Sequence, residues 1–123
     1  MTSMTPIRPL DRIVRNLRRD AFVRFEAGGM VEEGTSYLQL DPSRPPGTGL
    51  YAYRMVPGAI TTPHEHTSDE LFVVLEGELL DHDGTRYGPG DMVLLRAGTQ
   101  HNSTTPTGCT LLVYVDTLER PVP

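Results

Sequence analysis

Three potential metal ligands lie within seven residues near the middle of the chain: His64, His66 and Glu70. Because side chains alternate along a β-strand with a period of two, the spacing of the two histidines places them on one face. Imidazole and carboxylate groups together suit a divalent transition metal. The stretch therefore predicts part of a metal coordination sphere.

A fourth ligand must come from a distant part of the chain. Of the four histidines, His101 lies in a later glycine-containing stretch that begins at Gly90. His82 lies in an Asp-Gly turn, and we expect it to be solvated. Residues as far apart as His64 and His101 meet only if the intervening strands fold into a barrel or a sandwich.

The composition favours such a fold. The chain has 123 residues, enough for one domain with its own core. Its 12 glycines and 11 prolines recur between short apolar runs, which is typical of an antiparallel sandwich or barrel. We predict an all-β jelly roll over residues 21–116, with an N-terminal arm over 1–20 and a tail over 117–123. A single cysteine, Cys109, excludes an intrachain disulfide and a cysteine-based zinc site.

The arm has its own pattern. Leu10, Ile13, Val14 and Leu17 follow a helical period among several arginines, which predicts a short amphipathic helix. We expect this helix to lie on the barrel or on a partner subunit. An organelle transit peptide and a segment that binds an anionic surface are the alternatives.

Charge is unevenly distributed. The net charge is −5, but residues 1–24 count +4 and residues 25–123 count −9. An acidic body does not suit nucleic-acid binding. No apolar run approaches membrane-spanning length and no signal-peptide core is seen, so we expect a cytoplasmic protein that binds neither nucleic acid nor membrane.

Residues 71–75 are apolar at every position. A half-exposed strand would alternate, so we expect this strand to be covered on both sides. The outer cover has to come from the N-terminal segment or from another subunit, and we predict a homodimer.

Two glycine-bounded motifs resemble those of the cupin superfamily. The first runs from Gly58 through His64, His66 and Glu70 to Gly77, and it keeps every spacing of the family motif. The second is found at the positions Gly90, Arg96, Gly98, His101 and Thr105. Its glycines and histidine match, whereas Arg96 replaces the usual proline and Thr105 the usual asparagine.

The chain is thus similar to small single-domain cupins, including the cupin domain of ChrR-type anti-sigma factors. The resemblance implies a double-stranded β-helix, which is the jelly-roll barrel, and frequent homodimers. It also implies one metal ion held by His64, His66, Glu70 and His101. The identity of the ion stays open among Fe, Mn, Ni, Cu and Zn, because such mixed nitrogen and oxygen sites suit them all.

Several other side chains are candidates for a pocket beside the metal. They are Tyr51, Tyr53, Arg96, Gln100, Ser103 and Thr105. Simpler roles are packing for the tyrosines, solvent exposure for the arginine, and local backbone hydrogen bonds for the hydroxyls. Glu65 and Asp69 are expected to be solvated or to support the ligands.

Three functions fit this set of residues. The first is a dioxygenase-type oxidoreductase that acts on a small organic molecule. The second is a metal-dependent isomerase or lyase, for which Tyr51 and Tyr53 are the only candidate bases beyond the ligands. The third is a non-catalytic cupin that binds a metal or small ligand and signals through its basic N-terminal segment. The catalytic residues are not identified by the sequence.

Overall fold

The computed structural model describes residues 3–123, and its main feature is a six-stranded antiparallel sheet. The strand order is β1-β2-β3-β11-β5-β8. In that order the strands span Val23–Ala27, Met30–Gln39, Gly49–Met55, Cys109–Val115, Glu70–Gly77 and Met92–Leu95. Strand β11 therefore lies between β3 and β5, although it is far from both in sequence.

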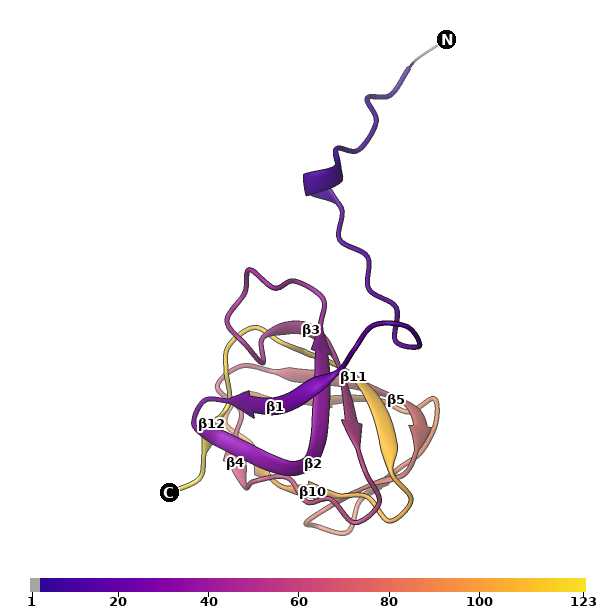
Figure 1. The fold of residues 1–123 in the computed structure, drawn as a ribbon. Helices are drawn as coiled ribbons and strands as arrows, with labels where there is room; N and C mark the ends of the chain where they lie inside the picture. The colour runs from indigo at the N-terminus through magenta and orange to yellow at the C-terminus, as the bar shows by residue number, and fades with distance from the viewer. Residues whose placement is uncertain (1–2) are drawn as a thin grey trace.

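Two smaller antiparallel sheets complete the barrel. One has the order β10-β6-β7 and contains Ser103–Thr104, Leu79–Asp81 and Arg86–Tyr87. The other has the order β12-β4-β9 and contains Arg120–Pro121, His64–Glu65 and Gln100–His101. Figure 1 shows the strands wrapped around a common interior. The predicted all-β jelly-roll barrel is confirmed.

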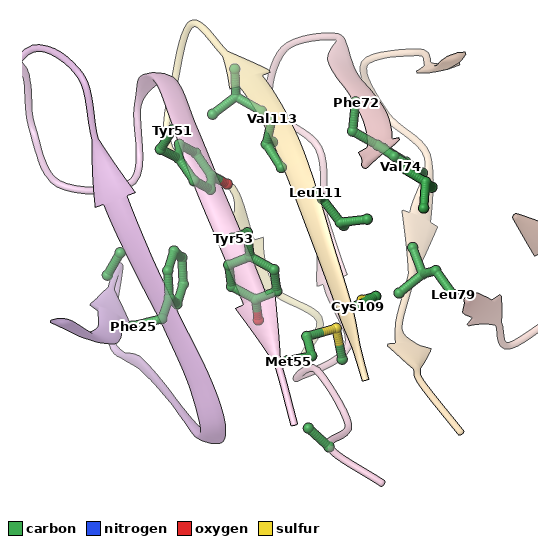
Figure 2. Packing of buried hydrophobic residues seen from close by; sticks show 13 residues of the cluster. Phe25, Tyr51, Tyr53, Met55, Phe72, Val74, Leu79, Cys109, Leu111 and Val113 are labelled. Carbon is green, nitrogen blue, oxygen red and sulfur yellow. The ribbon is translucent and has the colours of Figure 1, made fainter. Parts of the chain in front are cut away.

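The core lies between the large sheet and the smaller ones. Side chains of β3, β5 and β11 stand on the same side of the large sheet, as Figure 2 shows. The cluster of buried side chains consists of Phe25, Ala27, Tyr51, Tyr53, Met55, Ala59, Phe72, Val74, Leu79, Cys109, Leu111, Val113 and Val115. The ring of Phe25 packs edge-to-face against Tyr53, with centroids 5.3 Å apart. This packing directs Tyr51 and Tyr53 inward, a choice that strand alternation alone does not make.

The outer face of the large sheet is apolar and open. Leu71 and Leu75 of β5 are 43% and 42% exposed, and Leu94 of the neighbouring β8 is 44% exposed. The expectation of cover on both sides is therefore met only on the inner face within residues 3–123. The apolar side chains of the N-terminal arm do not supply the outer cover, since Leu10 is 94% exposed.

The predicted N-terminal helix is wrong. Only a short 3₁₀ turn, η1 (Pro9–Asp11), forms there, and the rest of the arm is irregular and leads away from the barrel (Figure 1). A helix of two turns is marginal unless its apolar face packs on something, and here the side chains at Leu10 and Val14 are exposed. The arm is fixed at its base, where Arg54 donates a 2.8 Å hydrogen bond to the carbonyl of Leu17.

Gly77 shows why the first motif ends in glycine. Its φ is +78°, and a Cβ placed there would lie 1.9 Å from the carbonyl oxygen of Gly108. A side chain would push β5 away from β11 at the point where the two strands pair.

In the described part of the chain, no helix has both the length and the apolar character needed to cross a membrane.

Candidate metal centre

Short strands bring the predicted ligands together. In the pairing of β4 with β9, His64 lies directly opposite His101. The centroids of these two rings are 4.6 Å apart, and the ring of His66 lies 4.7 Å from that of His101. Glu70, at the start of β5, places Oε1 3.6 Å from His66 Nε2 and 3.8 Å from His101 Nε2. The structure thus gathers all four side chains in one cluster.

Hydrogen bonds orient two of the three rings through Nδ1. The Nδ1 of His64 lies 2.7 Å from the carbonyl oxygen of Thr62, which can only accept. The Nδ1 of His101 lies 3.1 Å from the carboxylate of Asp81. Each Nδ1 therefore carries the proton, and in the neutral ring Nε2 has a free lone pair directed at the cluster.

The ring of His66 is also oriented by a hydrogen bond from Nδ1, in this case to a hydroxyl group. The Nδ1 of His66 lies 2.9 Å from Thr99 Oγ1, and that hydroxyl donates its own proton to the carbonyl of Arg96. Thr99 must then accept from His66, so His66 also presents a free Nε2. Three imidazoles oriented in this way, each with Nε2 toward the cluster, can form the nitrogen half of a transition-metal site.

Glu119 is a fifth potential donor, which the sequence reading missed. It is 8% exposed, and its Oε2 lies 2.9 Å from His64 Nε2 and 3.6 Å from His66 Nε2. Residues 117–123 were expected to be a tail, but β12 pairs with β4 and carries Glu119 to the cluster. No local sequence signal marks this residue, because its position depends on a pairing between strands more than fifty residues apart.

Charge in the metal-free cluster is balanced by a proton. Burial lowers the pKa of His64, but the adjoining Glu119 carboxylate and the Thr62 carbonyl outweigh burial and raise it to about 9. Burial by itself would raise the pKa of Glu119, whereas His64 lowers it below its ordinary value. A positive charge on the His64 ring is therefore favoured next to the Glu119 carboxylate.

The polar atoms of the cluster fit a metal ion. Among residues 3–123, three buried side-chain atoms have no well-aligned hydrogen-bond partner: His64 Nε2, His66 Nε2 and Glu119 Oε2. Buried polar atoms normally have a partner, and these three point at one another. The ligand atoms fall into two sets within 4.8 Å, His64 with His66 and His101, and His64 with His66, Glu70 and Glu119. The cluster is therefore able to hold a metal.

A small cavity adjoins the cluster and is lined mainly by the inner face of the large sheet. Its apolar lining includes Phe72, Leu111 and Val113. Of the predicted pocket residues, Tyr51, Tyr53 and Ser103 line it. The tyrosine hydroxyls are visible in Figure 2.

The other predicted pocket residues lie outside this cavity. Arg96 and Gln100 are exposed, and they face Asp69 and Glu65 at the surface. Thr105 is fully buried, but its hydroxyl donates to the carbonyl of Glu78. For Arg96 the simpler alternative of solvent exposure describes what the structure shows, whereas the Thr105 hydroxyl bonds to a carbonyl 27 residues away and not to a local one.

Glu32 is a second carboxylate that the sequence reading missed. It is 6% exposed on the inner face of β2 and lines the cavity. It accepts hydrogen bonds from the Tyr53 hydroxyl, at 3.0 Å, and from the Thr62 amide. Burial raises the pKa of Glu32, and these two hydrogen bonds offset part of the rise. The sequence offers adjacent glutamates at 32 and 33, and only the packing shows which one is inside.

Comparison with known proteins agrees with this geometry. Residues 21–119 match the family described as the ChrR cupin-like domain. The chain belongs to the ChrR-like cupin family. The resemblance noted from the two glycine-bounded motifs is confirmed, and it extends to strands that precede both motifs.

Solved cupin structures resemble this cupin over most of its length. The polyketide cyclase RemF from Streptomyces resistomycificus is 24% identical, with 98% of this chain and 87% of that chain covered at a TM-score of 0.61. An acetylacetone dioxygenase from Acinetobacter johnsonii is 12% identical, with 100% and 85% covered at a TM-score of 0.68. These similarities show the fold.

The anti-sigma factor ChrR, solved in complex with SigE from Rhodobacter sphaeroides, is 25% identical to this cupin. The match covers 83% of this chain but only 52% of that one, at a TM-score of 0.58. No functionally curated protein matches the cupin. The structural relatives therefore include a cyclase, a dioxygenase and a regulatory protein, and the shared fold does not choose among their functions.

Proposed function

We propose that this cupin is a mononuclear metal-dependent oxidoreductase of the dioxygenase type that acts on a small organic molecule. The observation that carries the proposal is the convergence of three imidazole Nε2 atoms and Glu70 beside a buried, largely apolar cavity. His64, His66, His101 and Glu70 would hold the ion. A bound iron would act as a Lewis acid and as a template that holds a substrate next to O₂.

The side chains around the cluster have three roles in this proposal. Asp81 and Thr99 hold the imidazoles of His101 and His66 in the orientation that presents Nε2. Phe72, Leu111 and Val113 exclude water from the reacting groups. The tyrosine hydroxyls offer the few polar contacts that orient a ligand in an apolar cavity.

The test is O₂ consumption by the iron-loaded protein over a panel of enolisable diketones and phenols. We expect uptake that requires both metal and substrate and that is lost in His66→Ala. A protein that holds iron at full occupancy and consumes no O₂ with any compound of the panel would contradict the proposal.

A second candidate is a metal-dependent isomerase or lyase, and Glu32 is the observation that favours it. From the sequence, Tyr51 and Tyr53 are the only candidate bases beyond the ligands, and Glu32 adds a buried carboxylate in the cavity lining. It is tied to Tyr53 by a hydrogen bond, so the pair can hold or move a proton beside a bound carbonyl compound. Solvent deuterium exchange into enolisable ligands without O₂, lost in Glu32→Gln, would support this reading over the oxidative one.

The third candidate is a non-catalytic binding or sensing protein, and the arm favours it. Residues 3–20 lead away from the barrel and expose Leu10 and Val14 among arginines, as a segment for a partner protein would. Removing residues 1–20 tests this candidate. Loss of a partner with unchanged metal content supports it, whereas a lower unfolding temperature alone assigns the arm a structural role.

We also propose that the cupin forms a homodimer through the outer face of the large sheet. The outward side chains that line a groove there are almost entirely apolar, namely Leu50, Leu71, Val73, Met92, Leu94, Leu112 and Tyr114. A continuous apolar face of this kind is uncommon on a monomer. The cytoplasmic location stays a prediction.

A further inference from the structure

The C-terminal segment adds a carboxylate to the cluster of potential metal ligands. The carboxylate of Glu119 is buried, and its Oε2 lies 2.9 Å from His64 Nε2 without a well-aligned hydrogen bond. It is also one of four side chains whose ligand atoms all lie within 4.8 Å of one another. Glu119 is therefore as close to the shared pair, His64 and His66, as Glu70 is.

The hydrogen bonds to Nδ1 of the two histidines show which ring atoms face Glu119. Because Nδ1 of His64 and of His66 carries a proton, the Nε2 atoms are the ones that face Glu119, and each has a lone pair directed at it whenever its ring is neutral. A carboxylate oxygen facing two imidazole lone pairs is unfavourable unless something positive lies between them. One proton can lie between Glu119 Oε2 and only one of the two Nε2 atoms, whereas a divalent ion can bind all three atoms at once.

We propose that Glu119 is a fifth protein ligand of the metal, next to His64, His66, Glu70 and His101. This inference rests on the metal site of the proposed function and adds to it. Two carboxylates balance the charge of a divalent ion in a buried site. Five protein donors leave a six-coordinate ion a single free position, so a ligand that binds through two atoms must displace one of them.

The surroundings of Glu119 position it for this role. Strand β12 pairs with β4, which brings Arg120 opposite Glu65. Those two side chains form an ion pair on the outer side of β4, and the amide of Val122 donates to the carbonyl of Pro63. On the other side of Glu119, the Thr67 hydroxyl donates to the carbonyl of Leu118 at 2.8 Å. The segment is thus held at both ends, with the Glu119 side chain turned inward.

The first experiment measures metal affinity rather than turnover. The metal-free full-length protein is titrated with Zn²⁺ in competition with a chromophoric chelator. Removal of a direct carboxylate ligand in Glu119→Gln should weaken affinity at least about 10-fold, because loss of a group that only supports a ligand already costs about that much. The matched control is Glu32→Gln, which removes a buried carboxylate from the same cavity lining at a site outside the ligand cluster. We expect a smaller loss of affinity there, since Glu32 acts on the ion only through its charge and donates no ligand atom.

Two further measurements keep the test decisive. Glu119→Asp retains the charge but shortens the side chain, so a ligand role predicts weakened binding and a purely electrostatic role predicts wild-type affinity. If Glu119→Gln fails to fold, a crystal structure of the wild-type protein with Zn²⁺ answers directly, because the Glu119 carboxylate either is bound to the ion or is not.

Each outcome decides one claim. Wild-type affinity in Glu119→Gln, or a loss equal to that of Glu32→Gln, overturns the fifth ligand and leaves His64 and Glu119 as an ion pair of the metal-free protein. If His101→Ala also binds Zn²⁺ like the wild type, the metal site of the proposed function fails with it. If His101→Ala loses the metal while Glu119→Gln keeps it, only the present inference fails.

Discussion

The inner and outer faces of β5 differ in what covers them. On the inner face, Phe72 and Val74 are 3% and 1% exposed, and Glu70 joins the metal cluster. On the outer face, Leu71 and Leu75 keep over 40% of their surface exposed in the single chain. Both faces are apolar, yet only the inner one is covered by other parts of the same chain. An apolar run on a strand can therefore line a candidate ligand site on one side and leave an open apolar face on the other, which is where we propose a subunit contact.

The largest effect is expected on the inner side, at the ligands. His101→Ala should reduce affinity for a divalent metal by at least about 100-fold, because it removes a nitrogen donor and leaves its position to water. Elemental analysis of the purified protein measures the loss. His82→Ala is the matched control, since His82 is exposed and lies outside the cluster. Equal metal content in wild type and His101→Ala would contradict a metal site that includes His101 on the inner side of the barrel.

A substitution on the outer face should weaken dimerisation and leave metal binding unchanged. Leu71→Glu places a charge in the apolar face, and in a dimer through this face it should raise the dissociation constant at least 10-fold, or about 1.4 kcal/mol. Light scattering after size exclusion measures the mass, and metal content should not change. The equivalent change at exposed Ile60, which is outside the groove, is the control. A wild-type protein that is monomeric at high concentration would remove the proposed role of this face.

A smaller effect is expected inside the cavity at Tyr53. Tyr53→Phe removes the hydroxyl that donates to buried Glu32, which should lower the free energy of unfolding by about 1–2 kcal/mol. Urea unfolding measures it, and Tyr114→Phe is a suitable control because that hydroxyl bonds to an exposed carboxylate, Asp116. Equal losses in the two variants would show that burial does not distinguish the two hydroxyls.

The smallest effect concerns the pH dependence of stability. The pKa of Glu32 is raised above 4.5 in the folded protein by burial, so the folded state binds this proton more tightly than the unfolded state. Its contribution is fully present below the unfolded pKa and is lost as the pH rises through the folded value.

Stability of the metal-free wild type relative to Glu32→Gln should therefore fall between about pH 4 and pH 8. Thermal unfolding at the two pH values measures it. A difference that stays constant, or that grows with pH, would contradict a raised pKa at this position.

The two glycine-bounded motifs show which features of the structure can be predicted from residue spacing. His64 and His66 are neighbours on one short strand segment, and the bounding glycines mark the turns, so the fold class and the meeting of these side chains with Glu70 and His101 follow from the sequence. The helix predicted for residues 10–17 shows the opposite case. Its periodicity is sound, but a short helix needs a surface to pack on, and the structure gives Leu10 and Val14 none.

The sequence by itself determined the antiparallel β character of the chain, because period-two alternation and turn chemistry are local properties. The two glycine-bounded motifs added the resemblance to the cupins, and with it the expected group of four side chains. Alternation says which residues share a face, but not which face is inside. Only the tertiary structure turned Tyr51, Tyr53 and Glu32 inward, left Leu71 outward, and brought Glu119 to the histidines. Those outcomes depend on which distant strands pair, β11 with β5 and β12 with β4, and no short stretch of sequence encodes them.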